Sequence, residues 1–170
     1  EILNLKIPDL HIVVVDDNSP DGTSEVVKNV SAEHAEVELL LRTTRRGRGS
    51  AGIDGFKYAL EHGADYVVEM DADFSHHPRY IPSFLKTIQE TDMVIGSRFV
   101  AGGRDVNRGI VRRVITFLAS VYVRILLGLR IQDVSSGYRC FKRKVLEAIA
   151  LDSMISTGPS IVSEVFYRAH

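Results

Sequence analysis

The stretch Ile12-Val-Val-Val-Asp-Asp-Asn-Ser-Pro-Asp-Gly-Thr23 passes from four apolar residues to three acidic ones within ten positions. A short aliphatic run without a polar face is typical of a β-strand covered on both sides, so we expect a buried strand over 11–16. Three later segments have the same character, at 37–41, 65–70 and 92–96. Acidic residues at the end of such a strand are typical either of a phospho-accepting receiver domain or of a nucleotide-binding enzyme.

Segments with helical periodicity alternate with these strands. They cover 23–33, 50–62 and 79–90, and Pro78 stands where a first helical turn tolerates proline. The alternation predicts an α/β fold, in which a mostly parallel sheet is flanked by helices and ligands bind beyond the carboxyl ends of the strands. After Gly96 we expect a long loop, an apolar helix over about 110–129, a short strand near 138–141 and two shorter helices.

Composition narrows the classes of protein. The 170 residues are 45% hydrophobic and 25% charged, which fits one domain over 1–170. A net charge of -1 argues against a nucleic-acid partner. The single Cys140 excludes an internal disulfide and suits a reducing compartment. No apolar run reaches the roughly 18 residues of a spanning helix, so we expect a soluble or peripheral protein.

A second acidic cluster follows the strand predicted at 65–70. It reads Glu69-Met-Asp-Ala-Asp-Phe-Ser-His-His-Pro78. Alternate side chains of an extended segment point the same way, so Asp71 and Asp73 are expected to face one ligand. Two carboxylates that close repel each other unless a cation lies between them, and hard oxygen ligands favour magnesium or manganese. His76 and His77 directly precede Pro78, which predicts loop or cap positions for them before metal ligation.

A receiver domain would require further residues that the sequence provides only in part. Ser97 follows the next predicted strand, as a receiver requires, but no lysine lies between Lys86 and Lys142 to complete the set. The receiver interpretation is therefore disfavoured. A nucleotide-binding module without catalysis stays open as the non-enzymatic alternative.

Five motifs in order resemble the family 2 glycosyltransferases of the GT-A fold, most nearly the dolichyl-phosphate (polyprenyl-phosphate) mannosyltransferases. They are Val14-Val-Asp-Asp-Asn-Ser-Pro-Asp-Gly-Thr23, Gly47-Arg-Gly-Ser-Ala-Gly52, Met70-Asp-Ala-Asp-Phe-Ser-His76, Ile95-Gly-Ser-Arg-Phe99 and Asp133-Val-Ser-Ser-Gly-Tyr-Arg139. Family members usually open with a strand ending in Pro-x-Tyr-Asn-Glu and continue into a basic C-terminal segment. The resemblance therefore implies a GT-A domain that lacks its usual first strand and C-terminal part.

The resemblance also implies roles for single residues. Contact with the nucleotide sugar is implied for Val15, Asp16, Asp17, Gly49, Ala72 and Asp73. A catalytic Mg2+ or Mn2+ is implied at Asp71 and Asp73, with Ser75 as a weak third ligand. The acceptor phosphate is implied at Arg98, Arg112 and Thr116, and Asp133 stands where other members present a catalytic base.

Two positions near these motifs are less informative. Asp21 is expected either to contact the ligand or to cap the helix that follows it. Arg48 stands where the family usually has an aliphatic residue, and the sequence offers no reason for the change.

The segment from Arg98 to Arg130 is strongly positive, with seven arginines, one aspartate and no lysine. Arginine forks suit phosphate, and the apolar residues of the same segment suit a lipid chain or a membrane surface. The alternative is a helix that faces the core and carries solvated arginines at its ends.

The resemblance thus implies an inverting transfer of mannose, or another hexose, from a nucleotide sugar such as GDP-mannose to dolichyl or polyprenyl phosphate. A phosphate monoester, with a second pKa of roughly 6, arrives largely ionised and needs no base. The enzymatic alternative is a family 2 transferase acting on a glycan or alcohol, with Asp133 as base. We expect the cytoplasmic face of the membrane as the location, or the cytoplasm for this chain alone, and a transmembrane partner or domain outside it remains open.

Overall fold

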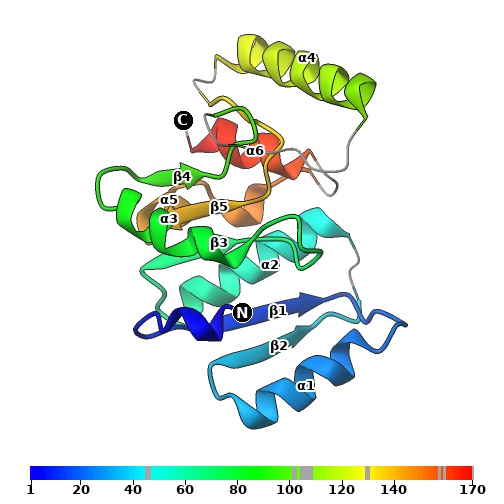
Figure 1. Cartoon of the computed structure of the whole chain (residues 1–170), viewed down its shortest axis with the longest axis vertical. Coiled ribbons are helices and arrows are strands. Elements are labelled where there is room, and N and C mark those ends of the chain that lie inside the picture. Colours follow the sequence, from blue (N-terminus) through cyan, green and yellow to red (C-terminus); the bar gives the residue numbers. More distant parts are fainter. Residues whose placement is uncertain are drawn as a thin grey trace.

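The computed structural model describes residues 1–44, 47–100, 103, 109–128, 131–156, 158 and 160–169, with only the backbone of 110–113 and 127. Five strands follow one another along the long axis in the order β2, β1, β3, β5, β4, with α1 at one end of the molecule and α4 at the other (Figure 1). The strands are β1 Ile12–Asp16, β2 Val37–Leu41, β3 Tyr66–Glu69, β4 Met93–Ile95 and β5 Arg139–Lys142. Each lies within one residue of its predicted position.

The helices alternate with the first four strands as predicted, which confirms the α/β class. They are α1 Thr23–Glu33, α2 Arg48–Glu61, α3 Ile81–Thr87, α4 Ile110–Leu127, α5 Arg143–Ala148 and α6 Ile161–Arg168. Short 3-10 turns cover Leu3–Leu5, Pro78–Tyr80 and Leu151–Ser153. The helix predicted over 79–90 is divided, because a 3-10 turn begins at Pro78 and the α-helical part ends at Thr87.

The sheet is less uniformly parallel than the alternation of elements suggests. β1 and β2 pair in parallel, with Ile12 opposite Val37. β5 lies between β3 and β4 and is antiparallel to both, so β3 and β4 run in the same direction. The reversal has a simple cause. The loop before β5 lies at the carboxyl ends of the other strands, where Asp133 contacts Arg98, and the strand must run away from that edge.

Helix α2 joins the two groups of strands. Among the described residues, backbone hydrogen bonds pair β1 only with β2, and β3 only with β5. Helix α2 contacts both β1 and β3. Two of its glycines permit the close approach: a Cβ at Gly55 would lie 3.1 Å from Val15 Cγ2, and one at Gly52 would lie 3.5 Å from Glu69 Oε1. A larger residue at Gly55 would therefore push the helix off β1.

Two hydrophobic clusters cover the two faces of the β3–β5–β4 sheet. One joins α2, β5, α5 and α6, and its fully buried members include Phe141, Leu146, Val165 and Phe166. The other lies beneath α3 and contains Ile81, Phe84, Ile88, Tyr138 and Cys140, against which the apolar residues of the N-terminal segment pack. Coverage on both faces explains why these strands lack a polar side in the sequence.

An ion pair between the partly buried Glu69 and the buried Arg139 crosses from β3 to β5 beside the first cluster. Arg139 is 1% exposed and stands opposite Glu69 in the ladder, where its Nη2 donates to Glu69 Oε2. The guanidinium carbon lies 5.3 to 6.0 Å from the ring centroids of three phenylalanines, Phe56, Phe141 and Phe166. Burial raises the pKa of Glu69, although the positive charge of Arg139 opposes the rise. The Glu69 carboxylate and the Arg139 guanidinium therefore compensate each other's charge.

We expect Arg139→Met to lower the free energy of unfolding by about 3 kcal/mol, because it leaves the Glu69 carboxylate in an apolar setting without its partner. The double variant Arg139→Met/Glu69→Gln should regain part of the loss. Urea unfolding followed by circular dichroism would measure both. Arg143→Met is the matched control, since this arginine forms an exposed pair with Glu147 on α5 and should change stability by less than about 1 kcal/mol. Equal losses in the single and double variants would contradict the pairing argument.

Candidate functional site

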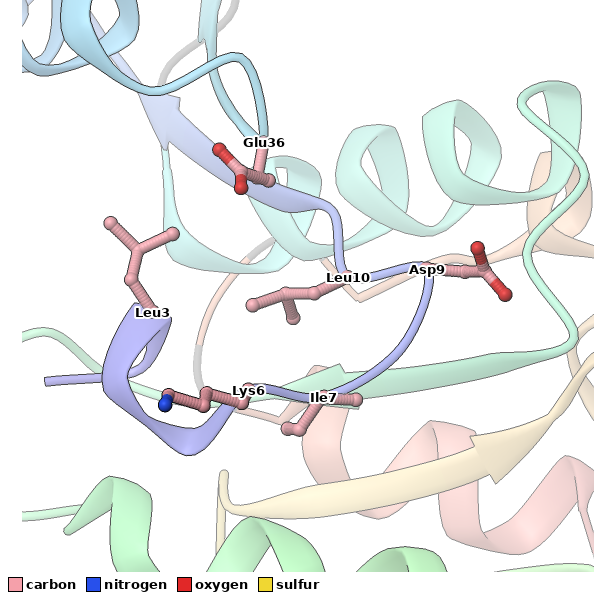
Figure 2. A pocket seen from close by; sticks show the side chains of 6 residues that line it. All are labelled: Leu3, Lys6, Ile7, Asp9, Leu10 and Glu36. Carbon is pink, nitrogen blue, oxygen red and sulfur yellow. The ribbon is translucent and has the colours of Figure 1, made fainter.

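The carboxyl ends of β1, β3 and β4 bring the predicted site residues to one edge. Asp17 follows β1, Asp71 follows β3 and Arg98 follows β4. The hollow drawn in Figure 2 lies elsewhere, because Leu10 precedes β1 and Glu36 precedes β2, which places it at the amino ends of these strands. Its lining consists of Leu3, Lys6, Ile7, Asp9, Leu10 and Glu36. It is therefore not part of the candidate site.

Two acidic residues, one at the end of β1 and one after it, hold the chain in place. Asp16 is buried and accepts hydrogen bonds from the Ser19 hydroxyl at 2.6 Å, from the Ser19 amide and from the Ser24 hydroxyl on α1. These bonds lower the pKa of Asp16. Asp21 accepts from the Thr23 amide at 3.0 Å and its hydroxyl at 2.7 Å, so it secures the first turn of α1, the second of the two roles its position allowed. The predicted nucleotide contact of Asp16 stays a prediction.

Asp17 is fixed at the edge by Arg42, which comes directly after β2. The buried Arg42 guanidinium donates to Asp17 through Nη1, to Asp54 Oδ2 through Nε at 2.8 Å, and to the Ser50 hydroxyl through Nη2 at 2.7 Å. The second carboxylate oxygen of Asp17 accepts from the Gly47 amide at 2.7 Å. The carboxylate is therefore positioned by two elements while part of it stays accessible at the surface.

The glycine-rich loop leads into α2 between Asp17 and Asp71. Gly47 has φ 128°, a backbone conformation that favours glycine, and it directly precedes the first helical residue, Arg48. Gly49 is buried in the first turn of the helix. The Arg48 side chain reaches across to the next strand, where its Nη2 lies 2.9 and 2.8 Å from the two carboxylate oxygens of Asp71.

The loop after β3 is shaped by its own side chains. The Asp71 amide donates to His76 Nδ1 at 2.9 Å, and the His76 ring stacks on Tyr138 with centroids 5.0 Å apart. His77 Nδ1 accepts from the Arg79 amide at 3.2 Å at the start of the 3-10 turn. The predicted loop and cap positions of the two histidines are confirmed.

Asp73 lies on the exposed side of the same loop, beside Ala72, which is also exposed. Its Oδ1 accepts from the Ser75 amide at 3.0 Å and from the Ser75 hydroxyl at 2.6 Å, which lowers the pKa of Asp73. The residue between them, Phe74, has φ 64° and a side chain open to solvent. Asp73 is thus ionised at neutral pH and presented outward.

The oxygen ligands here suit a hard divalent ion only in part. Nowhere in the described residues do three or more His, Cys, Asp or Glu side chains form a group that could hold a metal. Magnesium is commonly held by one or two carboxylates together with substrate phosphates, and Asp71 and Asp73, with the Ser75 hydroxyl, could provide such an incomplete set. The protein residues therefore fit a metal whose coordination a phosphate ligand completes.

On the other side of the site, Asp133 is enclosed by Arg98. Arg98 Nε donates to Asp133 Oδ2 and Nη2 to Oδ1, both at 2.8 Å, and the Arg98 amide donates at 3.2 Å. Ser135 adds its amide and its hydroxyl. Full burial alone would raise the pKa of Asp133, but the hydrogen bonds and charge of Arg98 outweigh it, and the net shift is downward. A buried carboxylate with a lowered pKa is a weak general base.

The remaining predicted acceptor residues lie on α4. Thr116 is half-buried there, whereas the side chain of Arg112 lies outside the described residues. The rings of Phe99 and Phe117 meet edge to face with centroids 5.8 Å apart, which connects the loop after β4 to this helix. The predicted phosphate contacts of Arg98, Arg112 and Thr116 stay predictions.

Sequence reasoning missed two arginines of the site. Arg42 follows a buried strand directly, and that position could have indicated a residue at the same edge as Asp17. No local sequence signal indicates that Arg48 reaches Asp71, because the two residues come from different elements, 23 positions apart.

Comparison with known proteins bears on this arrangement. The family description Glycosyl transferase family 2 matches residues 1–150. The chain belongs to this family. It is 43% identical over 162 residues to an undecaprenyl-phosphate mannosyltransferase of Micrococcus luteus, covering 95% of this chain and 67% of that protein. It is 40% identical over 164 residues to a polyprenol monophosphomannose synthase of Mycolicibacterium smegmatis, covering 95% and 62%. This family 2 chain thus spans about two thirds of the length of these relatives.

The fold of this glycosyltransferase is also found in a more distant protein. A crystal structure of glucosyl-3-phosphoglycerate synthase from Mycobacterium tuberculosis, in complex with Mn2+, UDP-glucose and phosphoglyceric acid, superposes with a TM-score of 0.60 at 20% identity. The match covers 90% of this chain and 51% of that one. At this level of identity the likeness concerns the fold, and it confirms the predicted GT-A class.

We expect Asp133→Asn to lower the free energy of unfolding at pH 7 by about 1.5 to 3 kcal/mol, because the charged partner of Arg98 is lost. The pKa of Asp133 is lowered in the folded protein, so its stabilisation is complete above the ordinary aspartate range and is lost as the pH falls below about 4. The difference in the free energy of unfolding between wild type and variant should therefore shrink towards zero at acidic pH.

Urea unfolding at a series of pH values would measure that difference. Asp152→Asn is the control, since Asp152 is an exposed aspartate paired with Lys57 and its change should leave stability nearly unaltered at every pH. A difference between wild type and Asp133→Asn that stays constant down to pH 2 would contradict the ion-pair argument.

Proposed function

We propose that this protein transfers a mannosyl residue from a nucleotide sugar, GDP-mannose in the simplest case, to a polyprenyl phosphate by one inverting displacement. The observation that carries the proposal is the bidentate pair between Arg98 and the buried Asp133, which leaves that carboxylate poorly suited to deprotonate an alcohol. The names of the two bacterial relatives, both mannosyl transfer proteins for polyprenyl acceptors, support the same conclusion. One GT-A domain is proposed to account for residues 1–170.

An ionised acceptor removes the need for a base. A phosphate monoester has a second pKa of roughly 6 and is a nucleophile at neutral pH as it arrives. The protein then has to align the phosphate oxygen with the anomeric carbon and to stabilise the negative charge that develops on the leaving diphosphate. On this proposal Asp133 is a positioning residue. It fixes the backbone and guanidinium of Arg98, which lies in the loop after β4 at the acceptor side.

The donor is proposed to lie along the edge from β1 to β3. Asp17 would contact the base, beside Val15 and Asp16, because it is the acidic residue at the end of β1 that stays partly accessible and is held rigidly by Arg42 and Gly47. Asp71 and Asp73, with Ser75, would hold Mg2+ or Mn2+ against the donor diphosphate. When bound, the ion would neutralise charge on the leaving nucleotide diphosphate.

Helix α4 is proposed to lie on the membrane surface. Leu118, Tyr122 and Ile125 recur at helical spacing and are 59%, 67% and 78% exposed, whereas Ser120 and Val123 face the protein. The helix contains no acidic residue. Figure 1 shows it at one end of the molecule, apart from the strands. An exposed apolar face without negative charge suits an anionic lipid surface, and the buried Cys140 fits the cytoplasmic side.

In the part of the chain that the structure describes, no helix is long and apolar enough to cross a membrane.

Wild-type protein is tested with a panel of three nucleotide sugars: GDP-mannose, UDP-glucose and UDP-N-acetylglucosamine. We expect product from GDP-mannose with a short polyprenyl phosphate as acceptor, and none with the matching polyprenol. Because the acceptor must be ionised, kcat/KM for the lipid phosphate should fall below about pH 6. Asp133→Asn, assayed under conditions in which the variant is folded, should show the same fall in kcat/KM at acidic pH. Turnover of polyprenol would favour the alcohol-acceptor alternative. So would a fall in kcat/KM at acidic pH that is seen in wild type and is absent from Asp133→Asn.

The double variant Leu118→Ser/Ile125→Ser should bind vesicles containing phosphatidylglycerol at least roughly thirtyfold more weakly, because each exposed side chain contributes about 1 kcal/mol or more of apolar burial at the interface. Vesicle sedimentation would measure the loss. Val26→Ser on α1 is the matched control, since Val26 is 63% exposed at the opposite end of the molecule and should leave binding unchanged. Equal binding by wild type and double variant would refute the docking face.

A further inference from the structure

Arg48 forms the contact between the donor-side helix and the first carboxylate of the Asp71-Ala-Asp73 loop. One guanidinium nitrogen, Nη2, lies 2.9 Å from Asp71 Oδ1 and 2.8 Å from Oδ2, so it occupies the bisector that a bidentate cation would use. The pair is not part of the core. The side chain of Arg48 is 52% exposed and that of Asp71 35%, so the arginine can leave without unfolding its surroundings.

The surrounding backbone leaves room for this guanidinium. A Cβ at Gly137 would lie 2.7 Å from Arg48 Nη2, 3.8 Å from Asp71 Oδ2 and 3.6 Å from the His76 ring. Any other residue at Gly137 would thus intrude on the space that the pair occupies. The four residues come from α2, the loop after β3 and the loop before β5, so the pair lies where these three segments converge.

A divalent cation at Asp71 and the guanidinium at its present position exclude each other. Both would use the same two oxygens, and a charge of two placed within a few ångströms of the arginine would repel it. The attraction that Arg48 supplies is modest, because exposed pairs of this kind contribute little. A bound metal would therefore displace the side chain, whose α2 backbone stays fixed by Gly47 and Arg42.

The donor diphosphate of the proposed function offers a destination for the released side chain. Its Cα lies on the first turn of α2, directly after Gly47, which contacts Asp17, and the side chain spans from there to Asp71. On the proposed function, the base lies at Asp17 and the metal at Asp71, so a diphosphate joining them passes the root of Arg48. A guanidinium pairs with phosphate oxygens through planar, charge-assisted hydrogen bonds.

We propose that Arg48 is an exchangeable internal cation, which neutralises Asp71 in the ligand-free protein and moves to the donor diphosphate when a divalent metal takes its place. The inference rests on the proposed function. It also gives a reason for an arginine at a position where the family usually has an aliphatic residue: the charge of Asp71 is compensated in the ligand-free protein, and metal and nucleotide bind more favourably together than the metal does alone.

The proposal predicts changes of opposite sign in one variant. With Mn2+ alone, Arg48→Met should bind about two- to fivefold more tightly than wild type, because the competing cation is gone. With GDP or UDP added in the presence of Mn2+, the same variant should bind the nucleoside diphosphate roughly tenfold more weakly, because a charge-assisted contact is lost. Isothermal titration calorimetry and the electron paramagnetic resonance of Mn2+ would measure both affinities.

Arg143→Met is the matched control, since it also removes an exposed arginine from a pair with one carboxylate but lies on α5, and it should change neither affinity. Unchanged or weaker Mn2+ binding by Arg48→Met, or unchanged nucleoside diphosphate binding, would overturn the role of Arg48 while the proposed function stands. Failure of wild type, Arg48→Met and Arg143→Met alike to bind Mn2+ or either nucleotide would instead overturn the proposed metal-dependent donor site, and Arg48 with it.

Discussion

The buried guanidinium of Arg42 is the constraint on which the proposed donor side of the molecule depends. A charge that is taken out of water must be paired and hydrogen-bonded, and here the partners come from two elements: Asp17 after β1, and Ser50 and Asp54 on α2. Because Arg42 itself follows β2, one side chain fixes the ends of two strands and the start of a helix. The position of Gly47 and the reach of Arg48 follow from it.

The proposed acceptor side uses the same principle with the charges exchanged. There the buried group is the carboxylate of Asp133, and the half-buried arginine after β4 compensates it. A third pair, Glu69 with Arg139, lies beneath the loop that bears Asp71. Each strand that ends at the site is thus joined to a neighbour by an arginine and a carboxylate. Hydrophobic packing forms the core of the domain, whereas these ion pairs fix the positions of the loops at the carboxyl ends of the strands.

Much of the framework could be predicted from the sequence because strand and helix signals are local. The aliphatic run of β1 and its acidic end, the alternation with helices and the loop positions of His76 and His77 all follow from neighbouring residues. The direction of β5 could not be predicted in this way, because it depends on where the preceding loop lies in space. The same holds for Arg42 and Arg48, whose partners are distant in sequence, and for Asp133, whose bonding to Arg98 depends on burial.

The sheet is interrupted between β1 and β3, and this has a consequence for how the molecule opens. In the described residues these strands share no ladder, and α2 contacts both. Amide hydrogens of β1 and β2 should exchange with solvent in a cooperative event of lower free energy than those of β5, which is paired on both edges. A ligand that contacts Asp17 and Asp71 at once would connect the two parts, and binding would then slow exchange in strands that the ligand never touches.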